Sequence, residues 1–159
     1  MLLAGYQAGA VEVKMAIKFY KTKDPYGFMG NFFKARFFIY GRWWSFVEAP
    51  YQAQKTFVQE EQDAIWAVVK ANDSRLLGQK VTMRPDWDQV KRQVMKECVL
   101  AKFLQHPDLR KQLMATGDEE LIEDTKTTND MYWGCGTNGD GQNNLGKILM
   151  EIREELKGE

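Results

Sequence analysis

Two side chains that could do acid–base or nucleophilic chemistry, Glu48 and Lys55, lie close together in the sequence. They are seven residues apart, so an α-helix through this stretch would point both side chains at nearly the same face. Gln52 lies between them on that face and could bind a hydroxyl group. Ser45 and Glu48 also have the spacing of a capping box, and from spacing alone we favour this structural role for Glu48. Lys55 has a competing interpretation too, because most lysines are solvated at the surface.

Aromatic and acidic residues near the C-terminal end form a second group of candidates. Asp130 precedes Tyr132, Trp133 and Gly134, and it could supply a second carboxylate. An aspartate at such a position also commonly forms a turn. Trp133, together with Trp44, could stack on a flat base, although a tryptophan is more often part of the core.

Two asparagines, Asn31 and Asn143, lie in segments where the glycine-rich pattern predicts loops. They are candidate hydrogen-bonding groups for a ligand, while polar loop residues more often only shape turns. The run from Gly134 to Gly139 also matches the dinucleotide fingerprint G-x-G-x-x-G. We reject a Rossmann fold because too little chain follows for a second βαβ half.

The elements that must position these residues are mostly helices. Short strands are expected near residues 17–20 and 35–40, and Trp43-Trp44 could pair back as a third strand. Apolar residues at steps of three and four predict an amphipathic helix over residues 87–105, with Cys98 as a buried, inert thiol. The other helices are expected near residues 47–58, 60–71, 73–78, 107–115 and 145–156.

The expected architecture is therefore mainly α, a single multi-helical domain with a few short N-terminal β-strands. We assign residues 15–159 to this domain. Residues 1–14 are interpreted as an N-terminal extension and a candidate for disorder, because Met15 reads like a second start. This stretch has the features of neither a signal peptide nor a membrane span.

Composition excludes several classes of protein. The 22 basic and 22 acidic residues give a net charge of +0, so nonspecific binding of nucleic acid through charge is not indicated. One histidine and two separated cysteines give neither a metal-ligand spacing nor a disulfide framework. We expect no metal, no cofactor and a reducing, cytoplasmic setting. Five tryptophans leave aromatic surface that could line a pocket for a flat ligand.

Several short motifs occur in one order along nearly the whole chain from Ile17 onward. In that order and spacing they resemble the NADAR family, also called YbiA-like. Each motif is short, and their combination is specific. The motifs are Gly30-Asn31-Phe32, Trp44-Ser45-Phe46-Val47-Glu48-Ala49-Pro50-Tyr51-Gln52-Ala53-Gln54-Lys55, Trp87-Asp88, Ala101-Lys102-Phe103, Asp130-Met131-Tyr132-Trp133-Gly134 and Asn143-Asn144-Leu145-Gly146.

The resemblance implies a largely helical fold and hydrolysis of N-glycosidic bonds. The substrates that it implies are phosphorylated ribosylamino-pyrimidine intermediates of riboflavin synthesis, or ADP-ribose attached to guanine in nucleic acid. It reverses our preference for a capping role at Glu48. With it, Glu48, Lys55 and Asp130 become the expected catalytic residues, and Lys55 could attack C1 of an opened ribose to form an imine. The expected substrate-binding residues are Asn31, Phe32, Trp44, Gln52, Trp133, Gly134 and Asn143.

The chain departs from the family pattern at Ser45, Ala49, Cys135 and Asn144. We expect these changes to cluster where a substrate lies and to affect the choice of substrate more than the reaction. They also leave room for an alternative, a module that binds ADP-ribose or a nucleotide without turnover. The expected partner is a small phosphorylated ribosyl or ADP-ribosyl substrate, with ADP-ribosylated nucleic acid as a further candidate, and no membrane.

Overall fold

The structure is a computed structural model that describes residues 15–158. Most of its regular secondary structure is helical. The expected extension, residues 1–14, lies outside the described residues. In chain order the elements are β1 (Ile17–Phe19), the 3₁₀-helix η1 (Gly27–Met29), β2 (Phe37–Ile39), β3 (Arg42–Trp44), α1 (Glu48–Ala53), α2 (Gln59–Trp66), α3 (Ala71–Gly78), α4 (Trp87–Gln105), α5 (Pro107–Ala115), β4 (Leu121–Glu123) and α6 (Asn144–Leu156).

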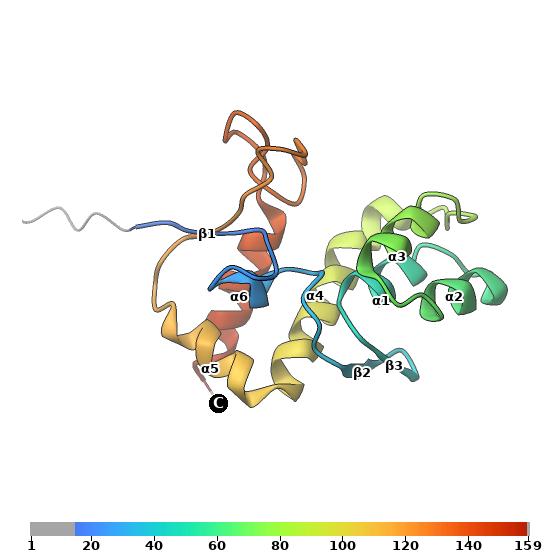
Figure 1. Ribbon diagram of the computed structural model, residues 1–159, viewed down its shortest axis with the longest axis horizontal. Helices are drawn as coiled ribbons and strands as arrows, with labels where there is room; N and C mark the ends of the chain where they lie inside the picture. The colour runs from blue at the N-terminus through green and yellow to red at the C-terminus, as the bar shows by residue number, and fades with distance from the viewer. Residues whose placement is uncertain (1–14, 159) are drawn as a thin grey trace, which may run out of the picture.

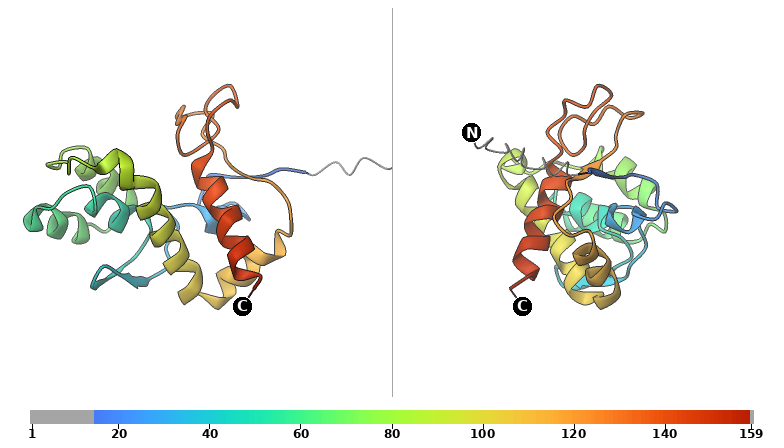
Figure 2. Two further views of the ribbon diagram at one scale, coloured as in Figure 1. Left: turned by 180° about the vertical axis from the view of Figure 1, so that it is seen from behind. Right: turned by 90° about the vertical axis from the view of Figure 1, so that its left-hand side faces the viewer.

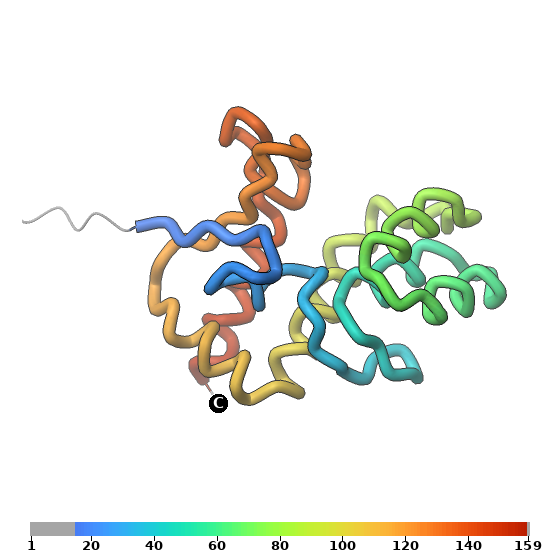
Figure 3. The backbone as a smooth tube through the Cα atoms, in the orientation of Figure 1, coloured from blue at the N-terminus to red at the C-terminus, as the bar shows by residue number. Residues whose placement is uncertain are grey.

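The long helix α4 runs through the middle of the molecule (Figure 1). Helices α1, α2 and α3 pack against one another on one side of it, and α5 and α6 contact it on the other. The view from behind shows the same two groups on either side of α4 (Figure 2). The chain passes from α3 to α5 through α4, and the segment between η1 and β2 crosses between the same two halves, as the backbone tube shows (Figure 3). This helix therefore fixes how the two groups meet.

Four short strands form two separate pairs. β1 lies parallel to β4, with Ile17 opposite Leu121, so the start of the described chain is held beside its last third. β2 and β3 form an antiparallel hairpin. Its two-residue turn has Tyr40 at φ 53° and Gly41 at φ 79°. Two positive φ angles are what the favoured type I′ hairpin turn requires.

The mainly helical, single-domain class is confirmed, and the amphipathic stripe on α4 is confirmed with it. Trp87, Val94 and Cys98 are buried on the inner face of this helix. Burial raises the pKa of the Cys98 thiol, which therefore stays protonated, as expected for an inert core cysteine. None of the helices within residues 15–158 has the length and apolar character needed to cross a membrane.

The prediction of a capping box formed by Ser45 and Glu48 is wrong. Helix α1 begins at Glu48, and no side chain caps its N-terminus. Ser45 instead lies in a bend that follows β3, and its carbonyl accepts a hydrogen bond from the Ala35 N–H at 2.9 Å. The helix also ends at Ala53, before its expected end, and Thr56 lies in the turn that follows. There the Thr56 hydroxyl accepts a hydrogen bond from the Val58 N–H at 3.0 Å, a local bond that competes with helix continuation.

Lys102, near the C-terminal end of α4, has a side chain that is 0% exposed. Its ammonium nitrogen donates hydrogen bonds to the carbonyls of Phe28 at 2.8 Å and Gly30 at 3.2 Å. Burial lowers the pKa of Lys102 to about 7. These bonds tie η1 to α4 and so position the next residue, Asn31, whose carbonyl accepts a hydrogen bond from the Glu48 N–H at 3.1 Å.

We predict that Lys102→Met lowers the free energy of unfolding by about 1–3 kcal/mol, because two buried carbonyls lose their donor. Urea unfolding at about pH 8, above the pKa of Lys102, measures the change. Lys96→Met is the matched control, since Lys96 lies on the same helix and forms only partly exposed ion pairs with Glu151 and Glu155. Its effect should stay below about 1 kcal/mol. Equal stability of Lys102→Met and the unaltered chain would contradict the account.

Candidate active site

Glu48 is buried at the first position of α1. Its Oε1 atom accepts a hydrogen bond of 2.7 Å from the Gln52 amide, one helical turn further on. Burial raises the pKa of Glu48, while the Gln52 bond and the charges of Lys55 and Arg75 oppose that rise. Glu48 is thus a carboxyl group withdrawn from water but surrounded by groups that favour its charged form.

Lys55 lies near Glu48, but it does not belong to the same helix as the sequence predicted. It lies just beyond the end of α1, so the expected two-turn helical offset is wrong. Its N–H bonds to the Gln52 carbonyl at 3.1 Å, and its carbonyl accepts the Arg84 N–H at 2.7 Å. Burial lowers the pKa of Lys55, and Lys91 lowers it further, while the charge of Glu48 raises it. The structure therefore brings Glu48, Gln52 and Lys55 together around a turn.

Two further cations lie near this pair. The charge of Arg75, on α3, acts on Glu48, and the charge of Lys91, on α4, acts on Lys55. The Lys91 ammonium also lies 4.2 Å from the centre of the Tyr132 ring. Lys55 and Arg75 thus act on the buried carboxyl and Lys91 acts on Lys55, an arrangement suited to a negatively charged ligand.

Asp130 organises the segment between β4 and α6, which extends beyond the helices in Figure 1. Its Oδ1 atom accepts hydrogen bonds from the backbone N–H groups of Tyr132 at 3.0 Å and Trp133 at 2.8 Å. The charge of Asp130 also raises the pKa of Glu48, although burial is the largest cause of that shift. Asp130 therefore lies near Glu48 and also performs the turn-forming role that its position in the sequence indicated.

Gly134 allows the same segment to fold tightly. A Cβ atom at this position would lie 2.3 Å from the Thr125 methyl group, so a larger residue does not fit. The Thr125 hydroxyl donates to the Asp130 carbonyl at 2.8 Å and accepts the Gly136 N–H at 2.8 Å. Gly134 thus supports the position of Asp130 and of the aromatic residues beside it.

Aromatic rings connect this segment to α1. Trp133 meets Tyr51 edge-on, with ring centres 5.6 Å apart, and Tyr132 edge-on at 4.7 Å. Tyr51 in turn contacts Trp87 at 5.2 Å. Because Tyr51 belongs to the same helix as Glu48, Trp133 forms part of an aromatic wall beside the carboxyl group.

Glu123, in β4, was not among the residues chosen from the sequence. Burial raises its pKa to about 8, and the charges of Asp130 and Glu48 contribute to the rise. Its Oε2 atom is buried and has no hydrogen-bond partner within residues 15–158. The signal was the strand period, since Glu123 shares a face with the core residue Leu121 and must therefore point inward.

Three other buried oxygens lack partners among the described residues, and two of them belong to candidate binding residues, Asn31 Oδ1 and Gln52 Oε1. The Asn31 amide nitrogen lies 3.4 Å from the Met95 sulfur, a weak acceptor. Buried polar atoms of this kind are usually paired, so both oxygens are candidate acceptors for a hydroxyl or amine of a ligand. We call Glu48, Lys55, Asp130 and Glu123 the carboxylate cluster. The two oxygens add hydrogen-bond acceptors to this cluster.

Three of the candidate binding residues, Phe32, Asn143 and Trp44, have surroundings that differ from those expected of a substrate contact. Phe32 is 39% exposed. The Asn143 amide bonds to the Glu123 N–H at 3.0 Å and the Leu121 carbonyl at 2.8 Å, so it serves as a hydrogen-bonding neighbour for β4. Trp44, at the end of β3, has a buried side chain, and its indole N–H donates to the Ile39 carbonyl of β2 at 2.9 Å.

The four departures from the family pattern fall in two places. Asn144 donates to the Tyr132 carbonyl at 2.9 Å, and the Cys135 N–H bonds to the Glu123 carbonyl at 3.0 Å, so both lie beside the carboxylate cluster. Ser45 and Ala49 instead line a hollow on the hairpin side of α1.

Within residues 15–158, no three His, Cys, Asp or Glu side chains are placed to hold a metal ion.

Comparison with known proteins identifies relatives over almost the full chain. The family described as NADAR domain matches residues 18–157. N-glycosidase Npun_R5314 of Nostoc punctiforme is 46% identical over 149 residues, which cover 90% of this chain and 94% of that protein. N-glycosidase YbiA of Escherichia coli is 39% identical over 142 residues, with 88% of each chain covered. Riboflavin biosynthesis protein VVA0006 of Vibrio vulnificus is 37% identical over 91% of this chain and 40% of that longer protein.

The fold agrees with the sequence comparison. The NMR structure of the Escherichia coli protein YbiA superposes with a TM-score of 0.82 at 38% identity, covering 91% of this chain and 86% of that one. The resemblance inferred from the short motifs is thereby confirmed over nearly all of the described residues. The chain belongs to the NADAR domain family.

Proposed function

We propose that this N-glycosidase, a hydrolase acting on N-glycosyl compounds, cleaves the bond between C1 of a phosphorylated ribose and the amino nitrogen of a pyrimidine. The observation that carries the proposal is the buried Glu48 carboxyl group with Lys55 beside it. The names of the relatives from Nostoc punctiforme, Escherichia coli and Vibrio vulnificus support both the reaction class and a riboflavin-related substrate.

Breaking a C1–N bond develops positive charge on the ribose ring, and we assign the stabilisation of that charge to Glu48. A carboxylate stabilises a neighbouring positive charge more strongly when little water surrounds it. Glu48 has this environment, because it is buried and its position is fixed by the Gln52 amide. The Asn31 and Gln52 oxygens without partners are candidate acceptors for ribose hydroxyls.

The departing nitrogen needs a proton, and Glu123 can provide one. With a pKa of about 8, its carboxyl group is largely protonated at neutral pH. In the proposed step the C1–N electron pair goes to nitrogen and the Glu123 proton completes the amine. Water then adds its hydroxyl group to C1, and its remaining proton returns to the carboxylate cluster. Atoms and charges balance without a cofactor.

Positive side chains around the cluster would hold the phosphate. Lys55, Lys91 and Arg75 come from the end of α1, from α4 and from α3, and their charges act on the buried pair. A lysine with a lowered pKa can also be an uncharged nucleophile, so Lys55 has a second possible role as the amine that forms an imine with C1 of an opened ribose. ADP-ribose on guanine presents the same kind of bond and is the second substrate to assay.

We predict that Glu48→Gln slows turnover about 10²–10³-fold while the protein stays folded, because only the charge is removed. Mass spectrometry of the released amine, with each of the two substrate classes, measures the rate. Glu60→Gln is the matched control, since Glu60 is exposed in the first turn of α2. A folded Glu48→Gln protein with undiminished activity would remove Glu48 from the mechanism.

Variants of Lys55 distinguish a phosphate contact from a covalent role. If Lys55 only holds phosphate, Lys55→Arg retains much of the activity because the positive charge remains. If Lys55 forms an imine, Lys55→Arg is inactive, and borohydride added during turnover yields a mass increase on the peptide that contains Lys55. The exposed Lys80 supplies the control variant Lys80→Ala. Full activity in Lys55→Ala would exclude both roles.

The proposed proton donor predicts a pH dependence. Glu123 must be protonated to act, so the rate should fall as the pH rises through its pKa of about 8. Glu123→Gln should react more slowly and lose this alkaline limb, whereas Glu120→Gln, exposed three residues earlier, should retain it. If the limb is unchanged in Glu123→Gln, it belongs to another group such as Lys55, and Glu123 is not the donor.

A further inference from the structure

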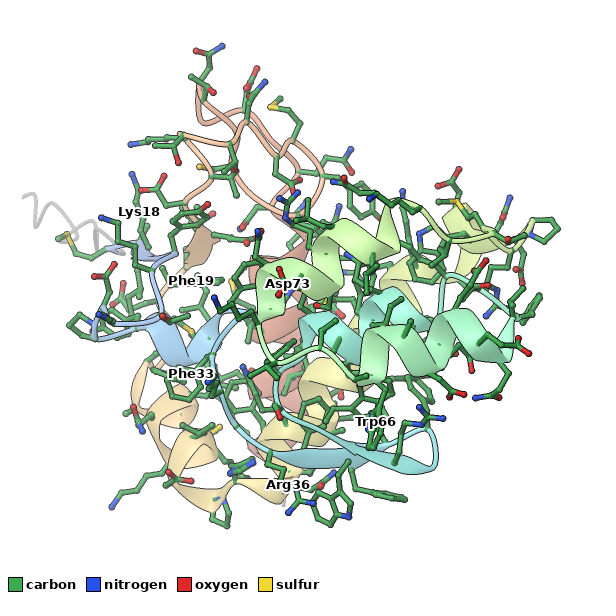
Figure 4. All side chains as sticks on the ribbon, turned by 45° about the vertical axis from the view of Figure 1, so that its right-hand side comes forward. Lys18, Phe19, Phe33, Arg36, Trp66 and Asp73 are labelled. Carbon is green, nitrogen blue, oxygen red and sulfur yellow. The ribbon has the colours of Figure 1, made fainter. Side chains whose placement is uncertain are left out.

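A cavity of about 220 Å³ opens on the hairpin side of α1, away from the side chains of the carboxylate cluster. Its walls include Trp43 from β3, Trp66 from the end of α2 and Arg36 from the segment before β2. Ala49 of α1 also lines it. We call this cavity the aromatic hollow. Figure 4 shows Arg36 and Trp66 at the same edge of the molecule, on either side of the hairpin ribbon.

The rings of the aromatic hollow are exposed and yet held in place. Trp43 is 48% exposed and Trp66 is 50% exposed, a large area of aromatic surface to leave in water. The Trp66 indole N–H donates a hydrogen bond of 2.9 Å to the Trp43 carbonyl, which joins α2 to the hairpin. Phe38 contacts the Trp43 ring edge-on, with ring centres 5.5 Å apart. Rings positioned in this way can stack on a flat ligand with little further loss of conformational freedom.

The charges beside the rings favour an anionic ligand. The Arg36 guanidinium carbon lies 4.7 Å from the centre of the Trp43 ring. No carboxylate among residues 15–158 forms an ion pair with Arg36, so its charge is available. Arg42 differs, because its guanidinium lies over Trp66 at 5.3 Å but pairs with Asp63 at 2.8 Å. The aromatic hollow thus combines stacking surfaces with the Arg36 cation, which has no carboxylate partner in the described part of the chain.

We propose that the aromatic hollow binds a base of a single-stranded nucleic acid, with Trp43 and Trp66 as stacking surfaces and Arg36 as the contact for an adjacent phosphate. Aromatic rings interleaved with arginine are the usual means of holding unpaired bases. Two exposed rings, Trp43 and Trp66, fit successive bases of a strand better than one free nucleotide. A duplex fits poorly, because its bases are already stacked on one another.

This site is distinct from the glycosidase site. Glu48 and Ala49 are neighbours on α1, but the Glu48 carboxyl interacts with Gln52, Lys55 and Asp130, and none of these lines the aromatic hollow. The net charge of +0 predicts moderate affinity that depends on stacking more than on long-range attraction. The proposal does not require the chain to cleave the nucleic acid that it binds.

The test is binding of fluorescein-labelled oligodeoxyadenylate and oligoadenylate strands of about twelve nucleotides, followed by anisotropy. Trp43→Ala and Trp66→Ala should each weaken binding roughly 5- to 100-fold, the range expected for loss of one stacked base. Arg36→Ala, which leaves both rings in place, should weaken it and reduce its salt dependence. Trp43→Phe should recover part of the affinity, which separates stacking from misfolding.

Phe57→Ala is the matched control, because the Phe57 ring is 69% exposed with the Arg84 guanidinium 4.5 Å away but lies outside the aromatic hollow. It should bind like the unaltered chain, and a duplex of equal length should bind more weakly than the single strands. The proposal is overturned if no strand binds, if Trp43→Ala and Trp66→Ala bind as the unaltered chain does, or if adenosine monophosphate or the duplex binds as tightly. Unmodified strands are used throughout, so these outcomes do not depend on whether the glycosidase assignment succeeds.

Discussion

The burial of the Glu48 carboxyl group is the constraint on which the rest of the site depends. Removing a carboxylate from water is unfavourable unless hydrogen bonds and opposite charges compensate. Gln52, Lys55 and Arg75 provide that compensation from α1, the turn after it and α3. In the proposed reaction, the same burial makes the charge of Glu48 more effective toward the positive centre on the ribose. The burial that is unfavourable for folding is thus the feature on which the proposed chemistry depends.

The fold positions this group from several directions at once. Lys102 of α4 holds η1 in place, and the carbonyl of Asn31, which follows η1, accepts the N–H of Glu48. On the other side, Asp130 turns the chain so that Trp133 meets Tyr51 of α1. Helix α1 is short, so its position depends on these contacts more than on its own hydrogen bonds.

Long, regular elements could be predicted from the sequence, while the site depends on contacts that local patterns do not encode. Helix α4 has the expected bounds because its apolar period is sustained, and α5 begins at Pro107 as expected. Lys55 was grouped with Glu48 through a helix that in fact ends at Ala53. Glu123 was not predicted because burial and the charges of Asp130 and Glu48 raise its pKa. Glu48 is distant in the sequence and Asp130 follows in a loop. Tertiary packing decided both cases.

The central claim is that Glu48 and Lys55 form an electrostatically coupled pair in a site largely removed from water. NMR titration of the Lys55 side chain, assigned by comparison with Lys55→Arg, tests this coupling directly. The pKa of Lys55 should lie below its ordinary value of 10.5 because of burial. It should fall further in Glu48→Gln, since the charge of Glu48 raises it. An ordinary pKa for Lys55 that is unchanged by Glu48→Gln would contradict the account.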